Sequence, residues 1–261
     1  IYVQSACSGG CKNVPGRMRI LILSDIHSNI VALETVLSAA KPYDTVWNLG
    51  DTIGYGPRPN ECVATIRTEA SMMLAGNHDL ACLGLLDLSD FNPDARAANI
   101  WNGDQLTDDH QMLLEELEPI QPINERFLAA HGSPREPVWE YLLTRYQALD
   151  NFRRFAQQVC LIGHSHVPLV FRLTPDGRCE GPSSPDDGAR LTLEDGFRYI
   201  INPGSIGQPR NQDPRAAFAI FDTAIDTITF HRVAYDIALT QRQMRDAQLP
   251  EALIARLEYG I

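Results

Sequence analysis

Residues 19–27 read RILILSDIH, an apolar run followed at once by Asp25 and His27. A short apolar run bounded by polar residues is typical of a buried β-strand. Between this strand and the next apolar run, apolar residues recur at helical spacing at Ile30, Leu33, Leu37 and Ala40. Later segments have the same strand-like form at residues 45–49, 72–75, 127–130 and 159–162. This alternation of strands and helices predicts an α/β fold.

The pattern changes twice along the chain. Residues 83–120 are predicted to form a helical excursion, because Asn92, which precedes a proline, and Thr107 have the residue types of helix N-caps. Beyond residue 162, we expect a second, antiparallel-rich sheet, then a helix after Asp236, with residues 174–190 as a long exposed hairpin loop. Its strands are predicted at residues 169–173, 191–193, 197–201, 217–221 and 227–233.

Composition excludes several classes of protein. The 22 Lys and Arg against 33 Asp and Glu give a net charge of −11, which argues against general nucleic-acid binding. The apolar runs are far shorter than the roughly 18 residues that a membrane-spanning helix needs, so no membrane partner is expected. Six cysteines in 261 residues are too few for a disulfide scaffold, and we interpret them as reduced thiols of a cytoplasmic protein.

Residues 1–17 have no periodic apolar pattern and no signal-peptide core. We expect them to be a tail, disordered or non-native, with the native start at Met18. Cys7 and Cys11 within it are interpreted as an incidental pair, because no matching zinc-type pair follows. The remaining residues, 18–261, are predicted to form a single domain that includes the helical excursion.

Residue types that bind metals follow the apolar strands. They come directly after five predicted strands, as Asp25 and His27, Asp51, Asn77 with His78 and Asp79, His131, and His164 with His166. The carboxyl ends of strands in an open α/β sheet gather at one edge, so these loops can converge on one pocket. Each fragment by itself also fits an ordinary turn, and only their combination points to a metal site.

The ligand chemistry predicts two ions. Imidazole, carboxylate and amide groups without thiolate suit a catalytic pair of divalent ions, and we expect Mn²⁺ first, with Fe, Zn, Ni and Co as alternatives. Asp51 would bridge the two ions. The first would be held by Asp25, His27, Asp51 and His166, and the second by Asp51, Asn77, His131 and His164.

This order of motifs resembles the calcineurin-like metallophosphoesterases, whose pattern is D-x-H, G-D, G-N-H-D/E, a lone H and G-H-x-H. Residues 54–61 and 202–210 further resemble the compact bacterial branch of YfcE-like and diadenosine tetraphosphatase-like phosphodiesterases. The resemblance implies a four-layer α/β/β/α sandwich, with two mixed sheets flanked by helices and the dinuclear site at the strand ends. It implies the same seven ligands.

The expected reaction is phosphoester hydrolysis by a hydroxide that bridges the two metals. His78 would protonate or steady the leaving oxygen, and Asp79 would orient His78. The alternative role for His78 is that of a structural brace beside the ligands.

Three further residues are candidates for substrate binding. Asn29 could donate to a phosphate oxygen or serve as a helix N-cap. Arg58 and Arg210 could grip a second phosphate or a base, or be solvated surface residues. The helical excursion could select substrates through exposed residues, or only bury its leucines; Arg96, Asn99 and Gln105 are expected to be exposed.

The leading hypothesis is a metal-dependent phosphoesterase for small phosphorylated substrates, with phosphodiesters, nucleotides and dinucleoside polyphosphates favoured. Phosphoprotein phosphatase is the rival activity. A non-catalytic interaction scaffold of the same fold, like the retromer sorting subunit, is the other alternative, and His78 argues against it. The sequence leaves the natural substrate and the oligomeric state open.

Overall fold

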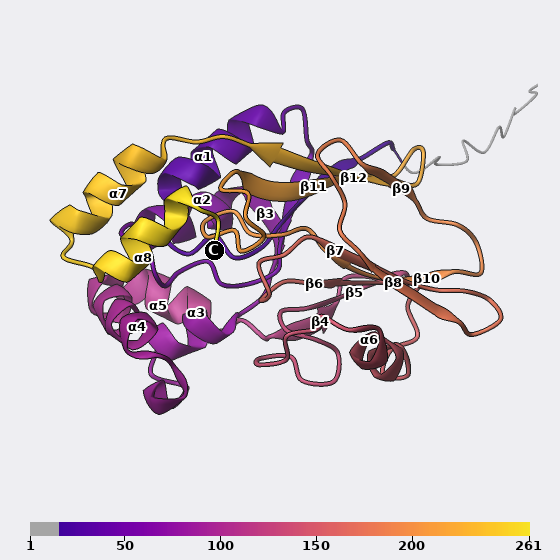
Figure 1. The fold of residues 1–261 in the computed structure, drawn as a ribbon, viewed down its shortest axis with the longest axis horizontal. Helices are drawn as coiled ribbons and strands as arrows, with labels where there is room; N and C mark the ends of the chain where they lie inside the picture. Colours follow the sequence, from indigo (N-terminus) through magenta and orange to yellow (C-terminus); the bar gives the residue numbers. More distant parts are fainter. Residues whose placement is uncertain (1–15) are drawn as a thin grey trace, which may run out of the picture.

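The computed structural model describes residues 16–261, and two mixed six-stranded sheets form its centre (Figure 1). Nearly all of the predicted tail, including Cys7 and Cys11, lies outside the described residues. The predicted α/β class with two mixed sheets flanked by helices is confirmed.

The first sheet combines the early strands with the last strands of the chain. Its order is β3-β2-β1-β11-β12-β9, in which β1, β2 and β3 are parallel and the later strands antiparallel. These strands are β1 (Arg19–Leu23), β2 (Thr45–Asn48), β3 (Ala70–Met73), β9 (Arg190–Thr192), β11 (Ala216–Asp222) and β12 (Thr227–Val233).

The second sheet has the order β4-β5-β6-β10-β7-β8, and β5, β6 and β10 are parallel within it. Its strands are β4 (Ile120–Pro122), β5 (Phe127–Ala130), β6 (Val159–Ile162), β7 (Leu169–Leu173), β8 (Cys179–Ser183) and β10 (Arg198–Asn202).

The expectation that the late strands form a sheet of their own is therefore wrong. They divide between the two sheets, because β11 pairs with β1 and β10 pairs with β6. The predicted hairpin loop at residues 174–190 is wrong as well, since it contains β8. The sequence of β8, CEGPS, reads as a turn, but an edge strand tolerates its proline.

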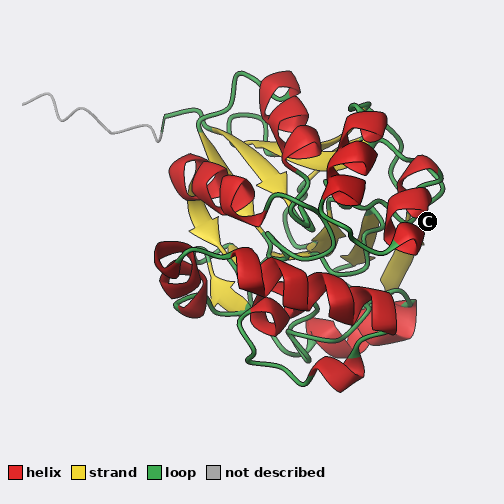
Figure 2. Ribbon diagram, turned by 90° about the vertical axis from the view of Figure 1, so that its left-hand side faces the viewer, coloured by secondary structure: helices red, strands yellow, loops and turns green. Residues whose placement is uncertain are grey.

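The layers follow from the two faces of each sheet. The core between the sheets includes Ile22, Trp47, Phe127 and Leu161. The outer face of the first sheet packs on α1 (Ile30–Ala39) and α2 (Pro59–Glu69), and that of the second packs on α6 (Arg145–Phe152). Figure 2 shows helices on both sides of the strands, as in the predicted four-layer sandwich.

Residues 83–120 contain η1 (Leu88–Asp90), α4 (Pro93–Gln105) and α5 (Asp108–Glu115). The Asn92 and Thr107 side chains cap α4 and α5, as their residue types predict. Leu114 is fully buried against Ile53 and Val63. Asn99 was expected on an exposed face and is instead fully buried, because α4 turns it toward the strand ends.

The C-terminal helices lie beside α4 and the loop after β2. They are α7 (Ile237–Asp246), α8 (Glu251–Ala255) and the short η2 (Arg256–Glu258). Together with α3 (Asn77–Cys82) and α4 they contribute side chains to one apolar cluster. In this cluster Leu253, Ile254 and Leu257 pack with Tyr55 and Phe91. The end of the described chain is thereby brought to the same side of the molecule as the loops that follow β1 and β2 (Figure 1).

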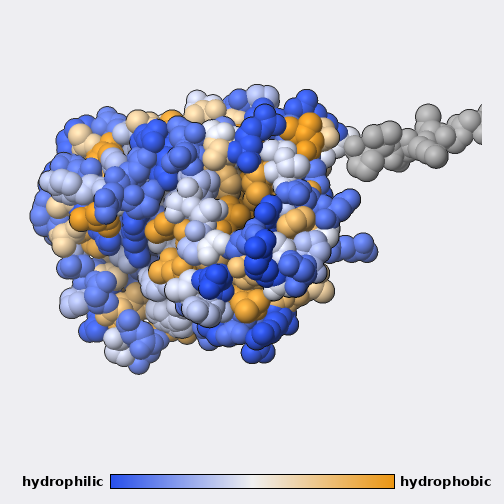
Figure 3. All heavy atoms as spheres, turned by 45° about the vertical axis from the view of Figure 1, so that its right-hand side comes forward, coloured by the Kyte–Doolittle hydropathy of each residue, from blue (hydrophilic) through white to orange (hydrophobic). Residues whose placement is uncertain are grey.

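No helix among the described residues is long and apolar enough to cross a bilayer. On the face shown in Figure 3, hydrophilic side chains separate the apolar ones into small groups. The cysteines within residues 16–261 are all free, as expected from their spacing.

Replacing Leu114 by alanine should lower the free energy of unfolding by about 2–5 kcal/mol, because it leaves a cavity beside Ile53. Urea unfolding would measure this loss. Met112 on the same helix is exposed, so Met112→Ala should change the free energy by no more than about 0.5 kcal/mol. Equal losses in both variants would contradict the assignment of Leu114 to the core.

Candidate metal centre

The predicted ligands lie in loops that leave parallel strands. Asp25 follows β1, Asp51 follows β2, His131 follows β5, and His164 and His166 follow β6. Because the parallel strands of each sheet point the same way, these loops meet at one end of the sandwich. The structure thus brings together side chains that are up to 141 residues apart in the sequence, from Asp25 to His166.

The backbone of the ligand loops is left-handed. Asp25, His27, Asp51, His164 and His166 all have φ between 50° and 63°. Asp and His adopt this conformation more readily than most residues, yet it still costs free energy, and such outliers cluster at functional sites. These tight turns direct the Asp and His side chains of the different loops toward a common point.

Glycines allow the loops to approach closely. A Cβ on Gly76 would lie 2.0 Å from the Asp51 carboxylate, and one on Gly163 would lie 1.9 Å from the Ser24 hydroxyl. At Gly50, which also has a φ of 96°, a Cβ would come within 2.8 Å of the His131 ring. The glycines of the G-D, G-N-H-D and G-H-x-H motifs are therefore required by packing at the site.

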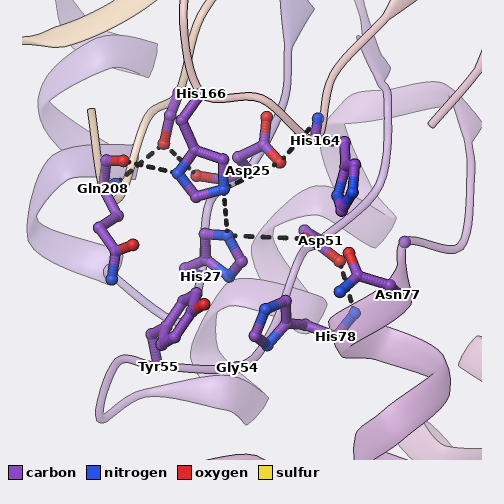
Figure 4. Close-up of polar contacts among 12 residues, drawn as sticks. Asp25, His27, Asp51, Gly54, Tyr55, Asn77, His78, His164, His166 and Gln208 are labelled. Atoms are coloured by element: carbon purple, nitrogen blue, oxygen red, sulfur yellow. Dashed lines mark hydrogen bonds and ion pairs between the residues drawn. The ribbon is translucent and has the colours of Figure 1, made fainter. Parts of the chain in front are cut away.

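The first cluster contains Asp25, His27, Asp51 and His166, all buried, with one potential ligand atom from each within 4.8 Å of the others. Figure 4 shows the His27 and His166 rings facing each other beside Asp25 and Asp51. Their Nε2 atoms are 3.0 Å apart, and His166 Nε2 lies 3.5 Å from Asp25 Oδ1.

The second cluster contains Asp51, His131 and His164 and shares Asp51 with the first. His131 Nε2 lies 3.4 Å from Asp51 Oδ2 and 3.2 Å from Asn77 Oδ1. The amide oxygen of Asn77 therefore joins the second cluster. The side chains of all seven candidate ligands lie at these two clusters, and which of them bind metal stays a prediction.

Hydrogen bonds to the main chain orient the imidazoles. The Nδ1 atoms of His27, His131 and His166 lie 3.2, 2.9 and 2.6 Å from the carbonyl oxygens of Ile53, Leu49 and Gln208. A carbonyl can only accept, so Nδ1 donates and Nε2 points its lone pair into the cluster. In His164 the arrangement is reversed, because Nε2 donates to the carbonyl of Trp139 and leaves Nδ1 free.

These contacts fit cations. The two Nε2 lone pairs of His27 and His166 face each other, and one carboxylate oxygen each of Asp25 and Asp51 is buried without a hydrogen-bond partner. Unpaired acceptors of this kind are costly in a buried site unless a positive charge lies between them. The nitrogen and oxygen donors suit divalent ions such as Mn²⁺, Fe²⁺ or Zn²⁺.

The pKa values of the ligands depend on one another. Burial and the nearby Asp51 raise the pKa of Asp25 to about 7. Burial alone would raise the pKa of Asp51 too, but His131 and His78 outweigh it and hold the pKa well below its usual range. Burial would lower the pKa of His131, yet Asp51 raises it to about 9. Protons therefore compete with cations for this site.

His78 lies against the first cluster, but its orientation differs from the prediction. Its Nδ1 lies 2.7 Å from Asn99 Oδ1, so Asn99 on α4 orients the ring, and not Asp79. The Asp79 carboxylate instead accepts from the main-chain N–H groups of Thr52, Ile53 and Gly76 and ties the β2 loop to α3. Asp79 comes next in the sequence, but its side chain points away from the His78 ring.

The three residues predicted to bind substrate lie in different surroundings. Asn29 caps α1, and its amide is also engaged by the Gly207 carbonyl and the Thr240 hydroxyl, which matches the N-cap alternative. Arg58 is exposed and pairs with Glu61 at 3.3 Å, beside a hollow that none of the ligands line. Arg210 does lie at the site, where its main-chain N–H donates to the carbonyl of His166.

Residues that the sequence reasoning missed complete the surroundings of the clusters. Tyr55 packs on the His27 and His78 rings, and Tyr141 stacks on His164 with ring centroids 4.1 Å apart. Asn102 on α4 bonds to Ser28 and to the loop after β2. Tyr55 and Gln208 lie within motifs noted for their resemblance. Asn99 was expected only as an exposed residue that could help select substrates, and nothing in the sequence indicated a role for Asn102.

Two buried His and Asp clusters that share a carboxylate lie at the parallel strand ends of an α/β sandwich, and this site is that of a metal-dependent hydrolase. The chain belongs to the calcineurin-like phosphoesterase superfamily, whose domain model matches residues 18–226.

Comparisons with individual proteins agree with this family. An uncharacterized protein of Methanocaldococcus jannaschii is 35% identical, over 92% of this chain and 98% of its own. A metallophosphoesterase from Sphaerobacter thermophilus is 47% identical, with a TM-score of 0.84 over 94% of this chain and 100% of the other. A hypothetical protein from Pyrococcus horikoshii, 18% identical, shares the fold with a TM-score of 0.74 over 93% and 98%.

Asp51→Asn should reduce bound metal from about two ions per chain toward none, because the shared ligand loses its charge. Elemental analysis of the purified protein would measure the ions. Asp109 is exposed on α5, and Asp109→Asn should keep the full content. Two tightly held ions in the Asp51 variant would show that the clusters do not depend on this carboxylate.

Metal binding should release protons, and metal affinity should rise as the pH increases from 7 to 9. The raised pKa values of Asp25, about 7, and His131, about 9, mean that both groups hold protons below these pH values and lose them above. Isothermal titration calorimetry in buffers of different ionisation enthalpy would count the protons. An affinity that is constant over this range would contradict the assignment of these groups as ligands.

Proposed function

We propose that the protein hydrolyses small phosphodiesters or nucleotide-type phosphoesters with two divalent ions, Mn²⁺ foremost. The observation that carries this proposal is the sharing of Asp51 by two buried clusters, with the His78 ring directly beside them. Two adjacent cations, when bound, supply an activated water and stabilise the negative charge that develops on the phosphoryl oxygens.

The chain's own residues supply the ligands and a proton donor. The seven ligands would hold the cations in place, three of them fixed by Nδ1 hydrogen bonds to the main chain. His78 would donate a proton from Nε2 to the leaving oxygen, since its Nδ1 is occupied by Asn99. Burial lowers the pKa of His78, and an anionic phosphoester beside it would raise the pKa again and favour the protonated ring.

Burial of the site favours a small substrate over a phosphoprotein. Each predicted ligand is at most 3% exposed, and Tyr55 and Tyr141 lie over the His27 and His164 rings. An exposed peptide segment would need an open groove to bring its phosphate to the same atoms. A non-catalytic scaffold would not explain why one carboxylate oxygen each of Asp25 and Asp51 is buried without a hydrogen-bond partner.

The free cysteines among the described residues agree with a reducing compartment, so we place the protein in the cytoplasm.

Turnover assays test the proposal directly. The protein, reloaded in turn with Mn²⁺, Fe²⁺, Zn²⁺, Ni²⁺ and Co²⁺, should hydrolyse bis(4-nitrophenyl) phosphate and dinucleotides faster than phosphopeptides. Equal or greater rates on phosphopeptides would favour the phosphatase alternative. A metal-loaded protein that cleaves no phosphoester would overturn the proposal.

His78→Ala should keep both ions and lose on the order of 10²–10⁴-fold in kcat on alkyl esters, which need a proton on the leaving oxygen. The loss should be smaller with nitrophenolate, which leaves without protonation. The measurement is the ratio of kcat on the two substrates. The same fractional loss on both would exclude proton donation by His78.

Asn99→Ala should act in the same direction but less strongly, because it leaves His78 in place and removes only its partner. Its pH–rate profile should shift on the limb that reports the His78 proton. Arg96, on the exposed face of the same helix, provides the control, and Arg96→Ala should leave the profile unchanged. An unshifted Asn99 profile would assign this residue a purely structural role.

A further inference from the structure

Asn102 on α4 is fully buried, and its side-chain amide uses its full hydrogen-bonding capacity. Its Nδ2 donates to the main-chain oxygens of Gly56 at 3.1 Å and Ala98 at 2.9 Å. Its Oδ1 accepts from the Ser28 hydroxyl at 2.6 Å and from the Gly54 N–H at 3.2 Å. An amide offers two N–H donors and two acceptor lone pairs, so no capacity is left over. The carbonyl of Gly56 can only accept and the N–H of Gly54 can only donate, which fixes the orientation of the amide.

Three of these four bonds join α4 to the loops that carry candidate ligands. Ser28 directly follows His27 in the loop after β1, and the other two partners flank Tyr55 in the loop after β2. The two loops are also bonded to each other, since the His27 N–H donates to the main-chain oxygen of Asp51 at 2.9 Å. The Asn102 amide therefore attaches α4 to a pair of loops that already form one unit.

Close backbone contacts surround this link. A Cβ on Gly103, the residue after Asn102, would lie 2.3 Å from the main-chain oxygen of Cys82 at the end of α3. A Cβ on Gly54 would lie 2.8 Å from the Cβ of His78, and Figure 4 shows Gly54 close to the His78 ring. The helix that bears His78 and the loop after β2 are therefore both in direct contact with the part of α4 around Asn102.

His78 is supported by both of the elements that Asn102 joins. Asn99, which accepts from His78 Nδ1 at 2.7 Å, lies three residues before Asn102 and therefore on the same face of α4. From the loop after β2, the Tyr55 ring packs on the His78 ring with centroids 4.2 Å apart. A displacement of α4 would move Asn99 away from the ring, and a displacement of the loop would move Tyr55.

We propose that Asn102 is a positioning residue for the His78 ring and acts through Asn99 and Tyr55. It holds α4 and the two loops at the separation at which both contacts to the ring form. This inference rests on the proposed function, in which His78 donates a proton to the leaving oxygen. It goes further by assigning the position of the donor to a residue that bonds to neither the ring nor a candidate ligand. Misplacement of a reacting group by about 1 Å can lower a rate about 100-fold.

The alternative role is purely structural, since a buried and fully bonded amide also stabilises a fold. A purely structural Asn102 predicts a loss of stability with no preference among leaving groups. A positioning residue predicts, in addition, that its removal impairs the same step as the removal of His78. The dependence of the loss on the leaving group therefore separates the two roles.

Asn102→Ala should keep the metal content of the wild type and lower kcat about 10- to 100-fold on a dinucleotide, whose leaving group is an alkoxide. The loss should be smaller on bis(4-nitrophenyl) phosphate, because nitrophenolate leaves without a proton. In a His78→Ala background, Asn102→Ala should cause no further loss on the dinucleotide, since the donor that it positions is already absent. Equal fractional losses on the two substrates, or losses that multiply in the double variant, would overturn the proposal.

Ser28→Ala is a milder test of the same link, because it removes a single hydroxyl and one of the four bonds. It should show the same dependence on the leaving group, with a loss of about 2- to 10-fold. Thr227→Ala is the matched control. Thr227 is buried, its hydroxyl donates to the carbonyl of Ile225, and it lies at the end of the first sheet opposite the ligands. This control should lower the melting temperature and leave the ratio of kcat on the two substrates unchanged.

Hydrogen exchange of the metal-free protein gives a readout without turnover. The Gly54 N–H donates to Asn102, so Asn102→Ala should speed its exchange about tenfold, and residues 93–105 should exchange faster as well. Thr227→Ala should leave both regions unchanged. Unchanged exchange at Gly54 and in α4 of the Asn102 variant would overturn the proposed link. A wild-type protein that hydrolyses no phosphoester with any metal would overturn the proposed function, while exchange would still decide whether Asn102 holds α4 to the loop.

Discussion

The structure depends on one buried carboxylate, Asp51, which both clusters share. One of its oxygens accepts from the main-chain N–H of His78, and the other lies unpaired between His27 and His131. A buried carboxylate in this setting is stable only when positive charge surrounds it. The imidazolium of His131 can supply that charge without metal, and two cations can supply it with metal. The surrounding loops are built to hold this arrangement.

That arrangement is costly for the fold, and the chain compensates for it locally. Ligands in left-handed backbone and buried acceptors without partners would destabilise an ordinary loop. Asp79 offsets part of the cost, because its carboxylate accepts three main-chain N–H groups from the loop after β2 and from Gly76. The glycines let the loops pack closely enough for these bonds to form. The same hydrogen bonds and close contacts therefore stabilise the loops and fix the geometry of the metal centre.

The misassigned features share a physical cause. Asp79 was expected to orient His78 because it is the next residue, but neighbouring side chains in a helix diverge, and Asn99 reaches the ring from α4, 21 residues later. Strand partners were misjudged for a similar reason. β10 and β11 are apolar on both faces, so their composition shows that they are central but not which sheet they join.

The sequence by itself determined the α/β class and most strand positions and predicted the seven candidate ligands, because period, turn residues and ligand chemistry are local properties of consecutive residues. It also predicted that two ions would share Asp51, since seven donors exceed the needs of one ion. Only the tertiary structure decided the surroundings of the arginines. Arg58 pairs with Glu61 within its own helix turn in solvent, whereas Arg210 bonds to Tyr55 and Tyr141 beside the candidate ligands through contacts between segments far apart in the chain. Residue type fixes the charge of an arginine, but burial and distance fix what that charge can bind.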